Sequence, residues 1–539
     1  MTSEIGGARR PEASDYEPYV MRLPSNAVSR FVAVALVAIG AGVAACGRSE
    51  HRSTAAQVRA SESYLQRGAV SIVPSADTIV VRSTPVAQAI PPGFVGLSLG
   101  YKAIELDAGS DPNALDPVFE QLIRDLAPGQ RPVLRIAGGD QVWWPVPHMA
   151  RPAGVNYNLT TGLLAVTRAL AQTLDARLIL GINFEADSTI VAGAQARALI
   201  NGIGREWIDA LELGNEPELY AAYPWYVLAD GQGVPGRPAD WSFGDLVQDF
   251  ANISRALPRT VTLAGPAMGS STWIPLLGQF LAGNPRVGLV TLHRYPLKHC
   301  SPKIPVTITQ LLSSASSTGL AQSVAQDVAI SHARGISLRI GEMGPIACGG
   351  MPGVSNSFAS ALWSLDALFA MARVNVDGVN MQTAKGSLNE LFSVGLVHGR
   401  WQAEVRPVYY GAMMFAQAAP AGSRLLAISA AAGADVDAWA TSAPSGYIHV
   451  VLINDDTRHA RSVNVRIPSG SGPATLERLQ APSVEAQSGV TLGGQSFGPQ
   501  TDTGQLAGTP STTSVTPVAG DYAVRLPGAS AAMLTLPGS

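Results

Sequence analysis

The sequence is poor in charge, and it has no basic block. Only 14% of its 539 residues are Asp, Glu, Lys or Arg, and the net charge is −3. We therefore expect no nucleic acid partner, because binding to a phosphate backbone needs clustered Lys and Arg. Hydrophobic residues make up 46% of the chain, enough for a large core, and the length fits two or three domains.

The sequence also lacks a run long enough to cross a membrane. Its most apolar stretch, Phe31–Ala45, falls short of the roughly 20 residues that a spanning helix needs. Two arginines precede this stretch and Cys46 follows it, so residues 1–46 resemble a bacterial lipoprotein signal. The resemblance implies a secreted, extracytoplasmic protein of a bacterium, held at a membrane by a lipid on Cys46, with residues 47–76 as a flexible tether. A non-lipidated signal peptide or a short anchor is the alternative.

Cysteine is nearly absent, and only Cys300 and Cys348 remain beside Cys46. In an oxidising compartment these two can form a disulfide. A bond also requires Cα atoms within about 7 Å, which the sequence does not reveal, so two free buried thiols are the alternative. His299 lies beside Cys300, but no set of ligands converges with it, and we expect neither a metal nor a cofactor.

Between residues 93 and 404, short apolar runs alternate with helical patterns such as Thr161–Leu174. Each run is apolar at its start and polar or Gly-rich at its end, as in strands buried on both faces of a parallel sheet. The alternation predicts an α/β fold, namely a (β/α)₈ (TIM) barrel. A doubly wound open sheet is the competing fold, but the sequence shows no Gly-rich phosphate motif to support it. The eight runs are Phe94–Tyr101, Pro132–Gly139, Leu178–Glu185, Ala210–Pro217, Thr262–Gly269, Leu289–Pro296, Leu338–Pro345 and Val376–Thr383.

The pattern changes after Glu404. Short alternating segments such as Tyr447–Asn454 are separated by Gly, Pro, Ser and Thr. This predicts an all-β sandwich over residues 405–539. Residues 77–92, ahead of the barrel, are also strand-like, and we expect them to contribute one or more strands to the same sandwich.

Two glutamates end the fourth and seventh runs, Glu216 and Glu342. Active sites of (β/α)₈ barrels lie at the C-terminal ends of the strands, where strands four and seven face each other. Two carboxylates about 5–5.5 Å apart suit double displacement on a sugar, whereas roughly 6.5–9.5 Å would admit water and give inversion. The alternatives are an acidic residue at a helix start for Glu216 and an ion pair with Arg339 for Glu342.

Four polar residues are predicted near the two glutamates. Asn215 precedes Glu216 and can donate to a sugar hydroxyl. His293 and Tyr295 share a face at the end of the sixth run, where Tyr295 can keep a nucleophilic carboxylate ionised. Asp140, after the second run, is a candidate for binding sugar hydroxyls, with turn stabilisation as the alternative.

The motifs around these residues resemble those of known glycosidases. LELGNEPELY (Leu211–Tyr220) is similar to the acid/base motif of the clan of retaining (β/α)₈ glycosidases. LHRYPLKHC (Leu292–Cys300), IGEMGPIACGG (Ile340–Gly350) and FASALWSLD (Phe358–Asp366) resemble glycoside hydrolase family 79, which includes β-glucuronidases and heparanases. The resemblance extends from about Gly93 to the C-terminus, and it implies Glu216 as acid/base and Glu342 as nucleophile.

The resemblance also bears on the loop after Glu342. It implies that this loop approaches a substrate carboxylate, which the backbone N–H groups of Gly349 and Gly350 can bind. A disulfide between Cys300 and Cys348 would pin the loop. Two positions depart from the family: Gly100 stands where relatives often carry an acidic residue, and Ala347 lacks a hydroxyl that some relatives use. Both departures concern the choice of sugar and leave the reaction intact.

The function predicted is that of a retaining, cofactor-free, exo-acting β-glucuronidase or related uronidase. Its partner would be a carbohydrate, either a glucuronide or a uronate-containing glycan. The alternatives are an endo-glycosidase on a glucuronate-containing polysaccharide and a neutral-sugar β-glycosidase. An alternative outside the enzymes is a non-catalytic lipoprotein that binds carbohydrate and has kept the barrel fold.

Overall fold

The computed structural model describes residues 77–155, 157–301, 303, 305–430, 436–467 and 472–538. All of them belong to one compact unit, Asp77–Ser539. The predicted signal region, Cys46 and the tether lie outside the described residues. Among the described residues, no helix is both long and apolar enough to cross a membrane.

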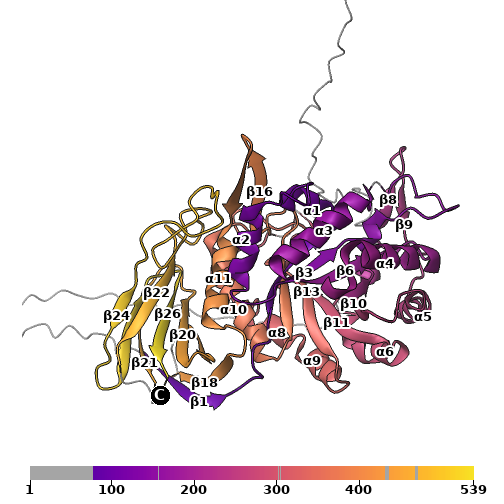
Figure 1. Ribbon diagram of the computed structural model, residues 1–539. Coiled ribbons are helices and arrows are strands. Elements are labelled where there is room, and N and C mark those ends of the chain that lie inside the picture. The colour runs from indigo at the N-terminus through magenta and orange to yellow at the C-terminus, as the bar shows by residue number, and fades with distance from the viewer. Residues whose placement is uncertain are drawn as a thin grey trace, which may run out of the picture. The chain divides into compact units, whose positions relative to one another are not determined.

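Eight parallel strands close into a barrel (Figure 1). Their order around the barrel follows the chain, and the last strand pairs with the first, Val379 lying opposite Val95. Each strand overlaps one of the eight apolar runs, so the predicted barrel is confirmed. The strands are β2 (Val95–Gly100), β3 (Val133–Ala137), β6 (Arg177–Ile182), β7 (Ile208–Leu213), β10 (Thr262–Met268), β11 (Val287–Arg294), β13 (Ser337–Met343) and β15 (Gly378–Gln382).

Helices connect the barrel strands, and side chains cap several of them. The side chain of Thr160 accepts a hydrogen bond from Leu163 N at the start of α3, and Ser242 forms a capping box with Asp245 at the start of α5. The α-helices are α1 (Tyr101–Ala108), α2 (Pro117–Leu126), α3 (Thr161–Leu174), α4 (Thr189–Ile203), α5 (Phe243–Ser254), α6 (Leu277–Gly283), α7 (Ile308–Leu311), α8 (Thr318–Gln322), α9 (Ala325–His332), α10 (Phe358–Arg373) and α11 (Pro407–Ala418). Short 3₁₀ turns are η1 (Gly139–Gln141), η2 (Arg205–Trp207), η3 (Pro217–Leu219) and η4 (Ile274–Leu276).

Helix α10 is buried along almost its whole length, because it packs against α11 and the second domain as well as the barrel. Phe369 of α10 stacks on Trp439 of that domain, with ring centroids 5.6 Å apart. Helix α11 follows the boundary that the sequence analysis placed at 404, and the next strand of the second domain, β18, starts only at Arg424.

The second domain is a ten-stranded, mostly antiparallel sheet with a core of its own. Strand β1 lies between β18, its antiparallel neighbour, and β21, its parallel neighbour, so segments from both ends of the described chain build this domain (Figure 1). The strands are β1 (Asp77–Pro85), β18 (Arg424–Ala430), β19 (Asp437–Ser442), β20 (Tyr447–Asn454), β21 (Arg461–Arg466), β22 (Ala474–Gln480), β23 (Thr491–Leu492), β24 (Thr513–Val515), β25 (Asp521–Leu526) and β26 (Ser530–Pro537).

Four small strand pairs follow barrel strands and therefore lie at the C-terminal face of the barrel. Among them, β12 and β14 join the loops after β11 and β13. The pairs are β4 (Val142–Trp143) with β5 (Tyr157–Asn158), β8 (Pro224–Val227) with β9 (Gly233–Pro235), β12 (Leu297–Lys298) with β14 (Ile346–Ala347), and β16 (Phe392–Val397) with β17 (Arg400–Val405).

Candidate active site

Glu216 lies on a tight turn directly after β7. Its backbone is left-handed, with φ at 50°, and Pro217 starts η3 immediately behind it. Its N–H donates to the carbonyl oxygen of Ala267 in β10, at 3.0 Å. A non-glycine residue in this conformation is uncommon and clusters at functional sites.

Glu342 lies near the end of β13, and its two carboxylate oxygens have different partners. Oε1 accepts a hydrogen bond from Arg135 Nη1 at 2.8 Å, and Oε2 accepts one from the hydroxyl of Tyr295 at 3.0 Å. The side chain is only 17% exposed. Arg339, the alternative partner, bonds instead to Asn380 and to the carbonyl oxygens of Gly93 and Phe94.

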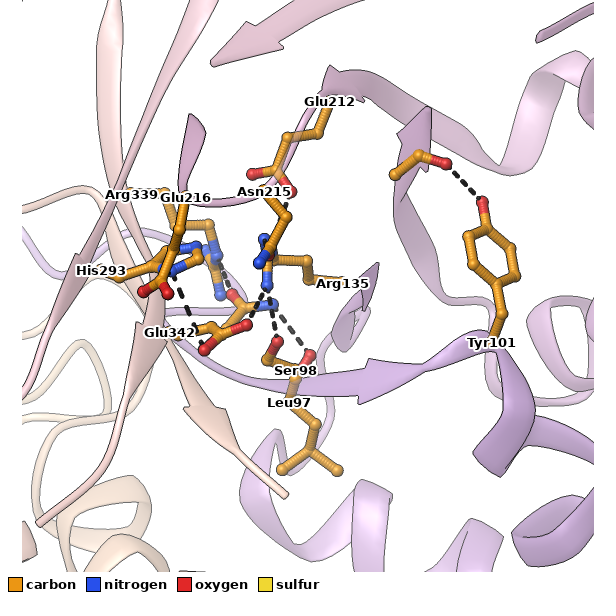
Figure 2. Close-up of polar contacts among 12 residues, drawn as sticks. Leu97, Ser98, Tyr101, Arg135, Glu212, Asn215, Glu216, His293, Arg339 and Glu342 are labelled. Atoms are coloured by element: carbon orange, nitrogen blue, oxygen red, sulfur yellow. Dashed lines mark hydrogen bonds and ion pairs between the residues drawn. The ribbon is translucent and has the colours of Figure 1, made fainter. Parts of the chain in front are cut away.

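His293 lies between the two glutamates (Figure 2). Its Nδ1 is 2.9 Å from Glu216 Oε1 and 3.8 Å from Glu342 Oε2. One oxygen of each glutamate and one ring nitrogen of His293 all lie within 4.8 Å of one another. The barrel thus brings together two carboxylates that are far apart in the sequence.

Arg135, which the sequence analysis did not select, lies beside Glu342 and connects it to residues of neighbouring strands (Figure 2). Its guanidinium is fully buried and holds Glu342 together with Glu212, whose Oε2 is 2.7 Å from Nε. It also donates to Ser98 Oγ at 2.9 Å and to Asn215 Oδ1 at 2.8 Å. The signal for it was an arginine and a glutamate inside the otherwise apolar runs PVLRIAGG and ALELGNEP.

The charges around Glu342 determine its protonation. Burial raises the pKa of Glu342. The charges of His293 and Arg135 and the hydrogen bonds from Arg135 and Tyr295 lower this pKa by more than burial raises it, so the net shift is downward. Burial lowers the pKa of His293, but Glu342 and Glu216 raise it by more. Burial, followed by the charge of Glu342, raises the pKa of Tyr295 well above 10. Glu342 is therefore a carboxylate and Tyr295 a phenol donor at neutral pH.

Asn215 is oriented by the same network. Its amide oxygen accepts from Arg135, so the amide NH₂ group points the other way and remains available as a donor. Its backbone N–H donates to the hydroxyl of Tyr220 at 3.1 Å.

The carboxylate of Asp140 bonds to other residues of the protein, unlike the predicted contact with a sugar. It lies in η1 and is 3% exposed. One carboxylate oxygen accepts from the N–H groups of Phe184 and Glu185, at 2.6 and 3.1 Å, and the other accepts from the hydroxyl of Tyr220 at 2.6 Å. Because both oxygens are occupied in tying the loops after β3, β6 and β7 together, the structure favours the alternative of loop stabilisation.

The loop after Glu342 is pinned by a disulfide between Cys300 and Cys348, whose Cα atoms are 5.1 Å apart. Cys348, Gly349 and Gly350 all have positive φ, at 66°, 85° and 92°. A Cβ on Gly350 would lie 2.9 Å from Asn389 Oδ1, so the turn requires glycine there. Among the described residues, no hydrogen bond joins Gly349 or Gly350 to either glutamate.

The site also has the geometry of a possible metal site. In the described part of the chain, the ligand atoms of Glu216, His293 and Glu342 lie close enough together to hold a metal ion. A divalent cation there would have to share Glu342 with the guanidinium of Arg135, 2.8 Å away, and would be repelled by it. The expectation that no metal is bound stays a prediction.

A (β/α)₈ barrel with glutamates at the ends of strands four and seven and an appended β domain is the architecture of a class of glycosidases. Residues 434–533 match the model of the glycosyl hydrolase family 79 C-terminal beta domain. A β-glucuronidase of Aspergillus niger is 26% identical over 327 residues, which cover 53% of this chain and 58% of that protein. The match thus spans less than two thirds of the relative. The predicted resemblance to glycoside hydrolase family 79 is confirmed.

Solved structures agree on the fold. A 4-O-α-L-rhamnosyl-β-D-glucuronidase from Fusarium oxysporum 12S, in complex with Rha-GlcA, matches with a TM-score of 0.63 and 18% identity, over 85% of this chain and 100% of that one. A family 51 arabinofuranosidase from Xanthomonas axonopodis pv. citri matches with a TM-score of 0.61 and 14% identity, over 85% and 100% of the two chains. At these identities the likeness shows the fold alone.

Proposed function

We propose that this protein is a retaining glycoside hydrolase that cleaves β-linked glucuronic acid by double displacement. The observation that carries the proposal is the distance between the two glutamates, whose nearest oxygens lie within 4.8 Å of each other. Retaining enzymes have carboxyl groups about 5–5.5 Å apart, and inverting enzymes leave roughly 6.5–9.5 Å for a water molecule.

The environments of the two glutamates support different roles. Glu342 is held ionised by Arg135, His293 and Tyr295, as a nucleophile must be to attack the anomeric carbon and form a glycosyl ester. Glu216 has a more exposed side chain, at 28%, and so can exchange protons with a leaving group and then with water. Glu216 protonates the glycosidic oxygen in the first step and deprotonates water in the second.

The proposed glucuronate specificity rests on two kinds of observation. A β-glucuronidase and a rhamnosyl-glucuronidase are among the similar proteins, and the glycine turn at Gly349 and Gly350 is a suitable backbone site for an anion. The alternatives are endo action on a glucuronate-containing polysaccharide and cleavage of a neutral sugar.

The test uses aryl β-glycosides that differ only in the substituent at C5. We expect the glucuronide to be cleaved and the glucoside to be cleaved at least 100-fold more slowly. NMR of the first-formed product should give the β-anomer. Equal cleavage of both substrates would refute the uronidase assignment, and an α-anomer would refute retention. Binding of the glucuronide without turnover would favour the non-catalytic alternative.

Substitution tests the two roles separately. Glu342→Gln should lower kcat by more than 10³-fold, because the amide is no nucleophile. Glu216→Gln should lower it by about 10²–10⁴-fold, the usual contribution of a general acid/base. Glu404→Gln, an exposed glutamate on β17, is the matched control and should retain full activity. Normal turnover by Glu342→Gln would remove Glu342 from the nucleophile role.

We also propose that the protein is an extracytoplasmic, lipid-anchored protein. The signal-like residues 1–46 support this proposal, and the Cys300–Cys348 disulfide is typical of oxidising compartments. Mass spectrometry of the mature N-terminus in a bacterial host should find a lipid-modified Cys46, and Cys46→Ser should abolish the modification. An unmodified mature N-terminus at another residue would contradict it.

A further inference from the structure

Glu218 is a buried carboxyl two residues after Glu216, and neither proposed step uses it. Its Oε1 accepts hydrogen bonds from the backbone N–H groups of Gly269 and Ser270, at 2.5 and 2.6 Å. Its Oε2 is buried and has no hydrogen-bond partner among the described residues. The side chain thus reaches from η3, after β7, to the backbone directly after β10.

The backbone that Glu218 holds lies against the carboxylate of Glu216. A Cβ built on Gly269 would be 2.8 Å from Glu216 Oε1 and 3.5 Å from His293 Cβ. The turn carrying Glu216 is tied to the same strand by the bond from its N–H to the carbonyl oxygen of Ala267. The position of the Gly269–Ser270 backbone therefore limits where the carboxylate of Glu216 can lie.

A glutamate at this position is unfavourable for stability. Burial, followed by the charge of Glu216, raises the pKa of Glu218 to about 7, although the backbone N–H groups of Glu218 itself, Gly269 and Ser270 lower it. Buried ionisable side chains with strongly shifted pKa values, which cost folding stability, concentrate at functional sites.

We propose that Glu218 is a positioning residue that holds the Gly269–Ser270 backbone against Glu216 and so fixes the acid/base carboxyl in line with the leaving-group oxygen. The proposal rests on the proposed function of Glu216. In this role Glu218 acts through the backbone of Gly269 and Ser270 and not on the sugar itself.

The experiment compares two aryl β-glucuronides, one with a 2,4-dinitrophenyl and one with a phenyl leaving group. The parameter is kcat/KM, which reports formation of the glycosyl-enzyme. Dinitrophenolate departs without a proton, whereas phenolate needs one, so a displaced acid slows only the phenyl substrate. Glu218→Ala, which removes the acceptor, should lower kcat/KM by about 10–100-fold for the phenyl substrate and by less than about 3-fold for the dinitrophenyl substrate.

Two further variants separate positioning from folding. Glu218→Gln keeps an amide oxygen for the same two N–H groups and should restore the phenyl substrate to within about 5-fold of the wild-type protein. Gly269→Ala should reproduce the leaving-group dependence with Glu218 intact, because its methyl group would displace Glu216. Glu404→Ala is the exposed control, and the unfolding temperature of each variant is measured.

Each outcome decides between the explanations. An equal loss of kcat/KM with both substrates in Glu218→Ala, or a Gln variant as impaired as the Ala variant, would overturn the positioning role. Wild-type kcat/KM for both substrates in Glu218→Ala would overturn it as well. Failure of the wild-type protein to cleave either glucuronide would instead refute the proposed function.

Discussion

At the scale of single residues, Arg135 links Glu342 on β13 to Glu212 and Asn215, which lie on and directly after β7. One buried guanidinium pairs with Glu342 and with Glu212 and orients Asn215, so three side chains depend on it. The remaining partner, Ser98 Oγ, satisfies one more N–H group. A buried cation with this many partners is favourable only while all of them are present.

Arg135→Met should therefore do two things. It removes the buried cation that pairs with both Glu342 and Glu212, which should destabilise the fold by about 3–5 kcal/mol. It also removes a cause of the lowered pKa of Glu342, so that pKa rises and the acid limb of the kcat/KM profile moves to higher pH. Arg135→Lys keeps the charge and should show a smaller shift. Thermal unfolding and a pH profile check both effects, and an unmoved acid limb in Arg135→Met would contradict the assignment.

The disulfide acts at the scale of elements, because it joins the loop after β11 to the loop after β13 beside the β12–β14 pair. The Cys300→Ser/Cys348→Ser protein should lose about 2–4 kcal/mol of stability, mainly because its unfolded chain is less constrained. KM for the glucuronide should rise more than kcat falls, since the glycine turn is loosened while Glu342 stays on β13. Reductant should give the wild-type protein the same behaviour. Identical unfolding with and without reductant would show that the bond contributes nothing.

The contact between α10 and the β domain contains a buried acid, Asp366. Trp439 Nε1 donates to its Oδ1 at 2.7 Å. Burial, followed by the nearby charge of Asp437, raises the pKa of Asp366 to about 6. The folded state therefore holds this proton more tightly than the unfolded state, and the stability that this gives below about pH 4 is lost as the pH rises through 6.

Asp366→Asn should remove that dependence. The amide oxygen can still accept from Trp439, and no charge is buried at high pH. At pH 8 the variant should be more stable than the wild-type protein by about 3 kcal/mol, and near pH 4 the two should be alike. Denaturant unfolding at both pH values measures the difference, with the exposed Asp502→Asn as control. A variant that is less stable at pH 8 would contradict the sign.

For the whole molecule, the barrel followed from the sequence because eight strands buried on both faces leave a repeated apolar signal. Helix α11 was missed because its apolar residues point in nearly all directions, toward α10 and α2 and also toward β20, β22 and β23 of the second domain, and give no single face. The pairing partners of β1 could not be read either, since strand pairing over hundreds of residues leaves no local pattern.

The site was predicted only where a side chain ends a strand. Glu216, His293, Tyr295 and Glu342 were placed by their positions at strand ends, although their roles remain proposals. Arg135 and Glu212 lie inside strands, where a charge reads as an irregularity in an apolar run. Asp140 shows the converse, because only the folded loops reveal that its oxygens are already occupied.

Strand β1 gives a test of how the second domain is assembled. Ile79 and Val81 are 0% and 1% exposed in its core, and removing them should cost about 3–6 kcal/mol in apolar burial. A chain beginning at residue 86 should unfold at lower temperature than one beginning at residue 77, and it should aggregate because the edges of β18 and β21 are exposed. Calorimetry and light scattering compare the two. Equal melting and monodisperse behaviour would show that β1 is dispensable.

The position of β1 also imposes an order on the nascent chain. The ribosome completes β1 at Pro85, but its partners start at Arg424 and Arg461. At about 5–20 residues per second, the first partner begins to emerge roughly 17–70 s after β1. The barrel strands are all made in that interval and can close without β1. The first strand of the fold to be translated is therefore among the last to find its neighbours, and a message truncated after β18 but before Arg461 would yield a barrel with a permanently half-paired strand.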